Sequence, residues 1–229
     1  MAQSKWALAA VGVIGVALAA SAPAQAEPAA WPDDFLTRLE ATALVETLNA
    51  GILASNSATL SLEKWCGDHK LSGSGEAKIV AHLIRGEPKP ATAEQRQRLE
   101  VDSNEELKYR HVQLLCGERV LSEADNWYVP SRLTAEMNRL LDSTDTPFGK
   151  AVLDLKPYRQ TFAAKILWWP LAEGWETKPI PAAAATGAMT LPDALFEHRA
   201  VLYTKDRKPF SEVHEVYRRD LLAFPLPHP

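Results

Sequence analysis

Two short stretches of this 229-residue chain repeat each other, and the repeat constrains the fold more than any other feature. Residues 120–128 (VLSEADNWY) align without a gap on residues 209–217 (PFSEVHEVY). Two pairs of β-like runs contain them, 107–116 with 118–129 and 195–204 with 209–217, and each pair predicts an antiparallel hairpin. We therefore expect one supersecondary unit used twice, with a chance match between short strands as the alternative.

The repeat indicates which side chains share a face of the sheet. Because side chains alternate along a strand, Asn126 in the first copy and Glu215 in the second are the polar members of otherwise apolar faces. A buried carboxylate needs a cation, hydrogen-bond donors or a proton. Arg159, near the start of a strand expected over residues 158–169, is the best candidate partner for Glu215. A pair that only stabilises the fold and a pair that serves a ligand site both stay open.

The remaining patterns predict an α+β chain. Apolar spacing predicts helices over residues 35–53 and 58–68, the first of them capped by Asp33 or Asp34. A strand is expected over 77–84, a capping box at 92–95, a helix after Thr134 and a short helix at Pro147. We expect residues 170–192 to form a long connection and the Pro-rich end from Phe224 to be loose.

The first 26 residues have the form of a secretory signal peptide. Lys5 precedes an uncharged apolar run over residues 6–20, and Ala24-Gln25-Ala26 supplies the small residues of a cleavage site. We expect a periplasmic or secreted protein that begins near Glu27 and has no integral membrane span after cleavage. An uncleaved N-terminal anchor is the alternative. In an oxidising compartment, Cys66 and Cys116 are expected to form a disulfide, with two buried thiols as the alternative.

Several chemistries find no support in the sequence. Charges of both signs are interspersed and the formal net charge is −4, so we expect no nucleic-acid partner. The sequence has no Gly-rich phosphate loop, no paired-histidine metal motif and no Gly-x-Ser-x-Gly motif, so we expect no metal and no cofactor.

Several segments, taken in order, resemble the chorismate lyase-like proteins, whose fold is shared by the effector-binding domain of GntR-type regulators. These segments are residues 109–116, Trp127-Tyr128-Val129-Pro130, Thr146-Pro147-Phe148-Gly149, Arg159, and Lys208-Pro209 before Glu215. The resemblance covers residues 58–224, which leaves 27–57 as an N-terminal helix and 225–229 as a loose tail. It implies an α+β fold: a single curved antiparallel sheet with two similar halves, helices mainly on one face and a small enclosed ligand site.

The resemblance also implies roles for particular residues. Glu215 matches the glutamate that assists loss of pyruvate from chorismate, although an ungapped alignment puts His214 there. Arg159 matches an arginine that binds a ligand carboxylate, and the Phe148-Gly149 turn matches one that contacts ligand.

Two positions depart from the lyase pattern. The lyases have arginines where this chain has His111 and Asn126, which we expect to line the same ligand site. Neither residue reproduces bidentate carboxylate pairing, so we expect weak or absent activity on chorismate. Strand alternation is expected to point Arg110, next to His111, to the opposite face.

These observations predict an exported monomer that binds a small aromatic or carboxylate ligand. Elimination of pyruvate to give a hydroxybenzoate, ligand binding without catalysis, and a structural role in the envelope stay open.

Overall fold

The structure, a computed structural model, describes residues 30–181 and 187–226. The predicted signal peptide, residues 1–26, lies outside the described residues, as do 182–186 of the long connection and 227–229 of the tail. The larger elements follow in the order α1 (Phe35–Leu53), α2 (Ala58–Asp68), β1 (Ile79–Leu83), α3 (Ala93–Arg98), β2 (Lys108–Cys116), β3 (Arg119–Tyr128), α4 (Ala135–Ser143), α5 (Phe148–Ala151), β4 (Tyr158–Ile166), β5 (Ala194–Tyr203) and β6 (Pro209–Arg218). Short 3-10 helices are η1 (Pro130–Arg132), η2 (Leu153–Leu155), η3 (Trp175–Thr177) and η4 (Arg219–Leu222).

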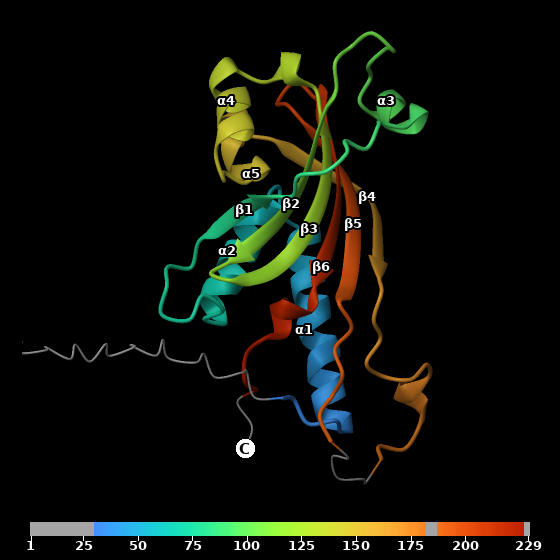
Figure 1. Cartoon of the computed structure of the whole chain (residues 1–229). Helices are drawn as coiled ribbons and strands as arrows, with labels where there is room; N and C mark the ends of the chain where they lie inside the picture. The colour runs from blue at the N-terminus through green and yellow to red at the C-terminus, as the bar shows by residue number, and fades with distance from the viewer. Residues whose placement is uncertain (1–29, 182–186, 227–229) are drawn as a thin grey trace, which may run out of the picture.

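The strands form one antiparallel sheet in the order β1-β2-β3-β6-β5-β4. Each half of the sheet consists of three consecutive strands that run from an edge to the centre, β1-β2-β3 in one half and β4-β5-β6 in the other. Strands β3 and β6 meet at the centre (Figure 1). The repeat aligns Asp125 with His214, and these two residues are direct partners in the β3–β6 ladder. The two halves are therefore related by an approximate two-fold axis through that pair, which confirms the repeat at the level of topology.

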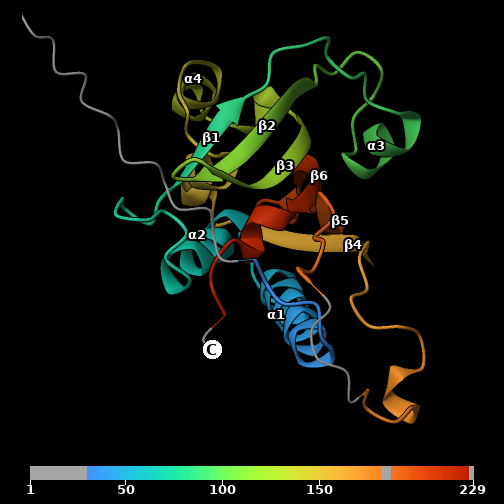
Figure 2. The ribbon, with the colours of Figure 1, turned by 60° about the horizontal axis from the view of Figure 1, so that its bottom comes forward.

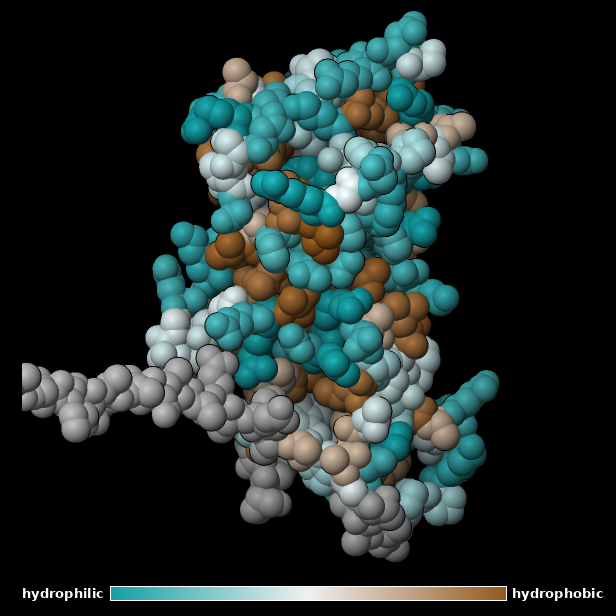
Figure 3. Space-filling model, viewed as in Figure 1, coloured by the Kyte–Doolittle hydropathy of each residue, from teal (hydrophilic) through white to brown (hydrophobic). Residues whose placement is uncertain are grey.

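Helices α1 and α2 lie along one face of the sheet, whereas α3 lies apart from the other helices (Figure 1, Figure 2). One cluster of buried apolar side chains joins α1, α2, α4 and the sheet, and a smaller one contains Leu99, Trp127 and Val129. The face seen in Figure 3 mixes hydrophilic and hydrophobic residues. The predicted α+β fold, with a single antiparallel sheet and helices packed on it, is confirmed.

Local signals determined most element boundaries. Asp34 caps α1 by accepting a hydrogen bond from the Thr37 backbone N–H at 2.8 Å, and Thr134 caps α4 in the same way through Met137. The capping box at Thr92 is present.

Strand β4 ends at Ile166, earlier than predicted. The backbone N–H groups of residues 167 and 168 both donate to the carbonyl of residue 195, so the regular ladder stops there.

Cys66 on α2 and Cys116 at the end of β2 form a disulfide with a Cα–Cα distance of 6.1 Å. The predicted disulfide is thus present, and it ties α2 to the sheet. No helix within residues 30–181 or 187–226 is both long enough and apolar enough to cross a bilayer.

One expectation about the C-terminal end is wrong at Phe224, whereas the loose tail over residues 225–229 stays a prediction. We expected a loose end from Phe224, but Phe224 is buried and stacks on His69 at 4.2 Å between ring centroids. Its carbonyl accepts a hydrogen bond from Trp31 Nε1 at 2.7 Å. The apolar Phe224 and Leu226 both pack on the main cluster, so burial of apolar surface outweighs the chain entropy that favours a free end.

Candidate ligand cavity

Arg159 and Glu215 form a buried ion pair on the helix-covered face of the sheet. Arg159 is on β4 and Glu215 on β6, two strands separated by β5, yet Nη2 lies 2.6 Å from Oε2. Arg159 is 8% exposed and Glu215 is 6% exposed. The partnership predicted from the sequence is present.

Two further buried side chains complete this polar group. Tyr217 donates its hydroxyl hydrogen to Glu215 Oε2 at 3.0 Å. His198 is the ladder partner of Glu215, and its Nε2 lies 2.8 Å from Asn49 Oδ1 on α1. The Nδ1 atom of His198 is buried with no hydrogen-bond partner in the described part of the chain.

Burial and the ion pair set the protonation states of this group. Burial lowers the pKa of His198 to about 4; Glu215 opposes this effect and Arg159 adds to it. Burial, together with the Glu215 charge, raises the pKa of Tyr217 well above its usual value. Burial opposes the charge on Arg159, but Glu215 and Tyr217 outweigh it and raise the pKa of that guanidinium. At neutral pH the histidine and the tyrosine are therefore uncharged beside one Arg–Glu pair.

A cavity of about 50 Å³ opens beside this pair. Its walls come from the start of α2, from α5 and from strands β2, β3, β4, β5 and β6. The residues lining it are Asn56, Ser57, Ala58, Thr59, Val112, Leu114, Ala124, Asn126, Phe148, Gly149, Pro157, Arg159, Leu202, Val213 and Glu215. A volume this small holds a few water molecules, whereas cavities for drug-sized ligands measure roughly 300–1,000 Å³.

Gly149 allows α5 to approach α2 closely at this cavity. A Cβ atom at position 149 would lie 2.9 Å from Thr59 Oγ1 and 3.2 Å from Ser57 Oγ. The Phe148-Gly149 turn therefore lies where the sequence analysis expected it, in the wall of the cavity.

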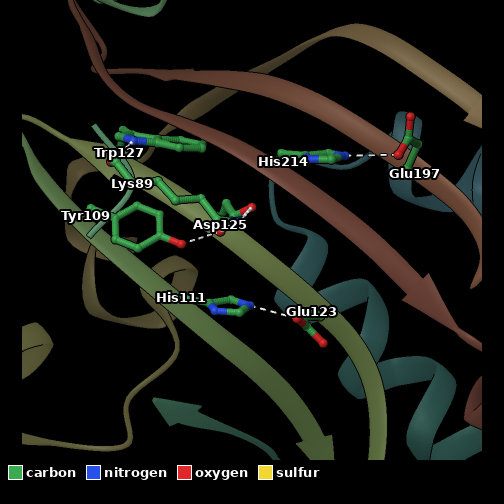
Figure 4. A network of polar contacts seen from close by, with 8 residues as sticks. All are labelled: Lys89, Tyr109, His111, Glu123, Asp125, Trp127, Glu197 and His214. Carbon is green, nitrogen blue, oxygen red and sulfur yellow. Dashed lines mark hydrogen bonds and ion pairs between the residues drawn. The ribbon is translucent and has the colours of Figure 1, made fainter. Parts of the chain in front are cut away.

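Asn126 and His111 were both expected in this site, but only Asn126 reaches it. Asn126 is buried, lines the cavity and accepts a hydrogen bond from Ser211 Oγ at 2.7 Å. His111 lies on the other face of the sheet, where its Nε2 is 2.7 Å from Glu123 Oε1 (Figure 4). Its neighbour Val112 lines the cavity, so alternation turns the His111 side chain away. The expectation that His111 shares the site with Arg159 is wrong.

Arg110 is the second correction on this strand. We expected it to point away from the ligand face, but it is buried on the helix-covered face as the ladder partner of Asn126. The alternation of Val112 and Leu114 was a signal for this orientation, because Arg110 lies an even number of residues from both. Matching His111 to a lyase arginine led to the wrong choice of face.

The outer face of the sheet carries a separate set of polar contacts (Figure 4). Asp125 accepts hydrogen bonds from Lys89 Nζ at 2.7 Å and from the Tyr109 hydroxyl at 2.5 Å. His214 Nε2 lies 3.0 Å from Glu197 Oε2. The alignment with the lyases matched either Glu215 or His214 to the catalytic glutamate. Of these two residues, only Glu215 lines the cavity.

His198 and Tyr217 belong to the site, although neither was expected there from the sequence. Tyr217 was identifiable, because it lies two residues after Glu215 on the same strand face. No pattern within β5 distinguishes His198, because its place depends on the β5–β6 register and on α1.

No family model matches the chain. Among solved structures, the ligand-binding domain of a putative GntR-family transcriptional regulator from Bordetella bronchiseptica is 15% identical, with a TM-score of 0.40 over 62% of this chain and 84% of that chain. PhnF from Mycobacterium smegmatis is 14% identical, with a TM-score of 0.45 over 77% of this chain and 70% of that chain.

A much stronger similarity is found at the sequence level. The uncharacterized protein y4mC of Sinorhizobium fredii (strain NBRC 101917 / NGR234) is 49% identical over 197 residues, which cover 86% of this chain and 83% of that protein. The chain belongs to the same family as protein y4mC.

Proposed function

We propose that this protein is an exported small-ligand-binding protein whose cavity holds a small aromatic or carboxylate compound against Arg159. The observation that carries the proposal is the state of the Arg159 side chain. It lines the cavity and donates to Glu215 through Nη2, while its Nε is buried without a hydrogen-bond partner in the described residues. A buried donor without an acceptor costs about 1–3 kcal/mol, so an acceptor oxygen from a ligand would stabilise it.

The other polar groups of the cavity support the same proposal. Ser57, at the start of α2, and Asn126, on β3, lie in its wall and can orient a second polar group of a ligand. Leu202, Val213 and Phe148 provide apolar contact for the rest of the molecule. This combination of an apolar wall with few convergent polar groups is typical of small-molecule sites.

The size and charge of the cavity favour a ligand smaller than chorismate. An aromatic acid such as benzoate already exceeds about 50 Å³, so it would enter only if α5 moved away from the start of α2, and chorismate would need a larger movement. Arg159 is also the only cation among the residues lining the cavity, whereas chorismate carries two carboxylates. Glu215 lies in the same wall, so elimination of pyruvate is the second candidate function.

Export is proposed from the sequence of residues 1–26 together with the disulfide, which persists in oxidising compartments. Mass spectrometry of the protein from the envelope fraction should find an N-terminus near Glu27. An intact Met1 on protein from the cytoplasm would contradict export.

The ligand proposal is tested by calorimetric titration of the mature protein with benzoate, 4-hydroxybenzoate and chorismate. Arg159→Gln should weaken binding at least tenfold, because the ligand oxygen loses its charged partner. Arg139→Gln is the matched control, since Arg139 is an exposed arginine paired with Glu136. Binding that is equal in both variants would contradict the proposal.

A turnover assay separates binding from lyase chemistry. We expect no pyruvate when the wild-type protein is incubated with chorismate. Release of pyruvate that Glu215→Gln reduces by about 10²-fold or more would instead establish the second candidate.

A further inference from the structure

Arg110 is a buried cation without a hydrogen-bond or ion-pair partner among the described residues. It is 6% exposed, and its Nε is completely buried without a hydrogen-bond partner. No hydrogen bond or ion pair joins its guanidinium to any residue in the ranges 30–181 and 187–226. An arginine stays protonated in a protein, so burial leaves it charged and short of its hydration shell. A group in this state needs an anion.

Arg110 is one of the residues that line a second cavity, of about 500 Å³. This volume is in the range of sites for small organic ligands and is about ten times that of the cavity at Arg159. Much of the wall is apolar or aromatic, with contributions from the end of β1, the segment after it, β2, β3 and α4. These residues are Leu83, Pro88, Pro90, Leu107, Trp127 and Leu141.

The charged residues of this cavity leave an excess of positive charge. Lys108 pairs with Asp142 at 2.8 Å, and Lys89 pairs with Asp125 at 2.7 Å. Arg96 donates through Nη1 to two backbone carbonyls, so it has hydrogen-bond partners but no carboxylate. Arg96 and Arg110 therefore contribute two cations that no acidic side chain of the described ranges neutralises by direct contact.

We propose that this second cavity binds a small organic anion, whose carboxylate or phosphate group pairs with the guanidinium of Arg110 and whose apolar body packs against Leu83 and Leu141 on the same face of the sheet. A guanidinium presents parallel N–H groups that match two oxygens of either kind of group. Burial lowers the pKa of Arg110 and outweighs the opposing effects of Tyr128 and Asp142, so the nearby Asp142 carboxylate does not compensate for the burial of this guanidinium. The site is separate from the cavity at Arg159, because the two have no lining residue in common.

Binding is measured by calorimetric titration of the mature protein with benzoate, phenyl phosphate, inorganic phosphate and the neutral benzamide. We expect one of the two aromatic anions to bind and benzamide not to bind. A comparison of the affinities for benzoate and phenyl phosphate shows whether the site prefers a carboxylate or a phosphate group. The affinity for inorganic phosphate shows whether binding requires the apolar part of the ligand. Arg110→Gln should weaken anion binding at least about 30-fold, because the anion loses a desolvated partner.

Two control variants assign any binding to one cavity. Arg139→Gln, at an exposed arginine, should leave binding within twofold of wild type. Arg159→Gln should leave anion binding at Arg110 unchanged, while it removes binding at the Arg159 cavity. Anion binding lost in Arg159→Gln and retained in Arg110→Gln would overturn this inference while supporting the function proposed above.

A stability measurement distinguishes a ligand-binding arginine from a structural one. Without ligand, Arg110→Met should keep or raise Tm by about 2–4 °C, because it removes an uncompensated buried charge. The anion that binds should raise Tm of the wild-type protein and not of Arg110→Met. A lower Tm in Arg110→Met with an unchanged response to the anion, or no binding of any anion to the wild-type protein, would overturn the inference.

Discussion

Arg159 and Arg110 are both buried arginines on the helix-covered face of one sheet, but their surroundings differ. Arg159, on edge strand β4, pairs with Glu215 at 2.6 Å, whereas Arg110, on β2, has no acidic partner in direct contact within residues 30–181 and 187–226. The cavity beside Arg159 measures about 50 Å³ and that beside Arg110 about 500 Å³. Burial alone therefore does not assign a role to a charged side chain. The groups that the rest of the chain brings to it decide whether its charge stabilises the fold or attracts a ligand.

The largest expected effect comes from breaking the Arg159–Glu215 pair. Glu215→Ala should lower the free energy of unfolding by about 3–5 kcal/mol, because it leaves a buried cation unpaired. The double change Arg159→Met with Glu215→Leu should recover most of this loss, since it removes both charges. Urea unfolding of the three proteins measures the difference. A cost below about 1 kcal/mol for Glu215→Ala would show that water already reaches the pair.

The disulfide is expected to affect the two cavities unequally. Replacing both Cys66 and Cys116 with alanine should cost about 3–4 kcal/mol, because the bridge closes a loop between residues 50 apart in the sequence. It also joins α2, whose start lines the Arg159 cavity, to β2. Binding at Arg159 should therefore weaken in the variant, while binding at Arg110 should persist. Equal weakening at both cavities would argue against a local effect.

His198 should make the stability of the Arg159 region depend on pH. Its pKa falls from 6.5 to about 4 on folding, mainly through burial, so between these values the unfolded chain binds a proton that the folded chain does not. Stability is therefore lost as pH falls from about 6.5 to about 4, by on the order of 3 kcal/mol. We expect the free energy of unfolding, measured by chemical unfolding across this range, to change less steeply with pH in His198→Gln than in the wild-type protein. Equal slopes would contradict the assignment.

The smallest effect is expected at Gly149, where the wall of the Arg159 cavity is tightest. Gly149→Ala places a Cβ atom 2.9 Å from Thr59 Oγ1 and should cost about 1–3 kcal/mol by overpacking. It should also weaken binding at Arg159 without changing binding at Arg110. Gly51→Ala is the matched control, because its added Cβ would have no described atom within 4 Å apart from its chain neighbours and the nearby backbone of its own helix, and alanine favours the α1 helix. A stability loss in both variants would contradict the packing argument.

Much of the fold was predictable because its signals are local. The bounds of α1 and α2, the caps at Asp34 and Thr134 and the stop of the strand at Pro130 each depend on residues within one or two turns. The repeat of residues 120–128 in 209–217 predicted the two central strands and their shared topology. The Arg159–Glu215 pair followed from a simple rule that a buried carboxylate needs a cation.

The errors arose where a position depended on a partner in another element. A similarity to lyase arginines placed His111 in the ligand site, although the alternation of Val112 and Leu114 in its own strand assigns it to the outer face. Phe224 was expected to be loose, because a sequence of prolines does not reveal the aromatic groups of Trp31 and His69 that contact it.

The sequence by itself determined the secondary structure, the repeated hairpin and the presence of a buried acid beside a basic residue, because alternation, capping and burial act over a few residues. Arg159 was the expected partner of Glu215, but only the tertiary structure decided that Arg110 is buried as well and is left without a carboxylate in contact. Strand order and register bring Glu215 to Arg159 across β5, and they bring no carboxylate of the described chain into contact with Arg110. Charge compensation depends on distances between side chains far apart in the sequence, so it is a property of the folded arrangement.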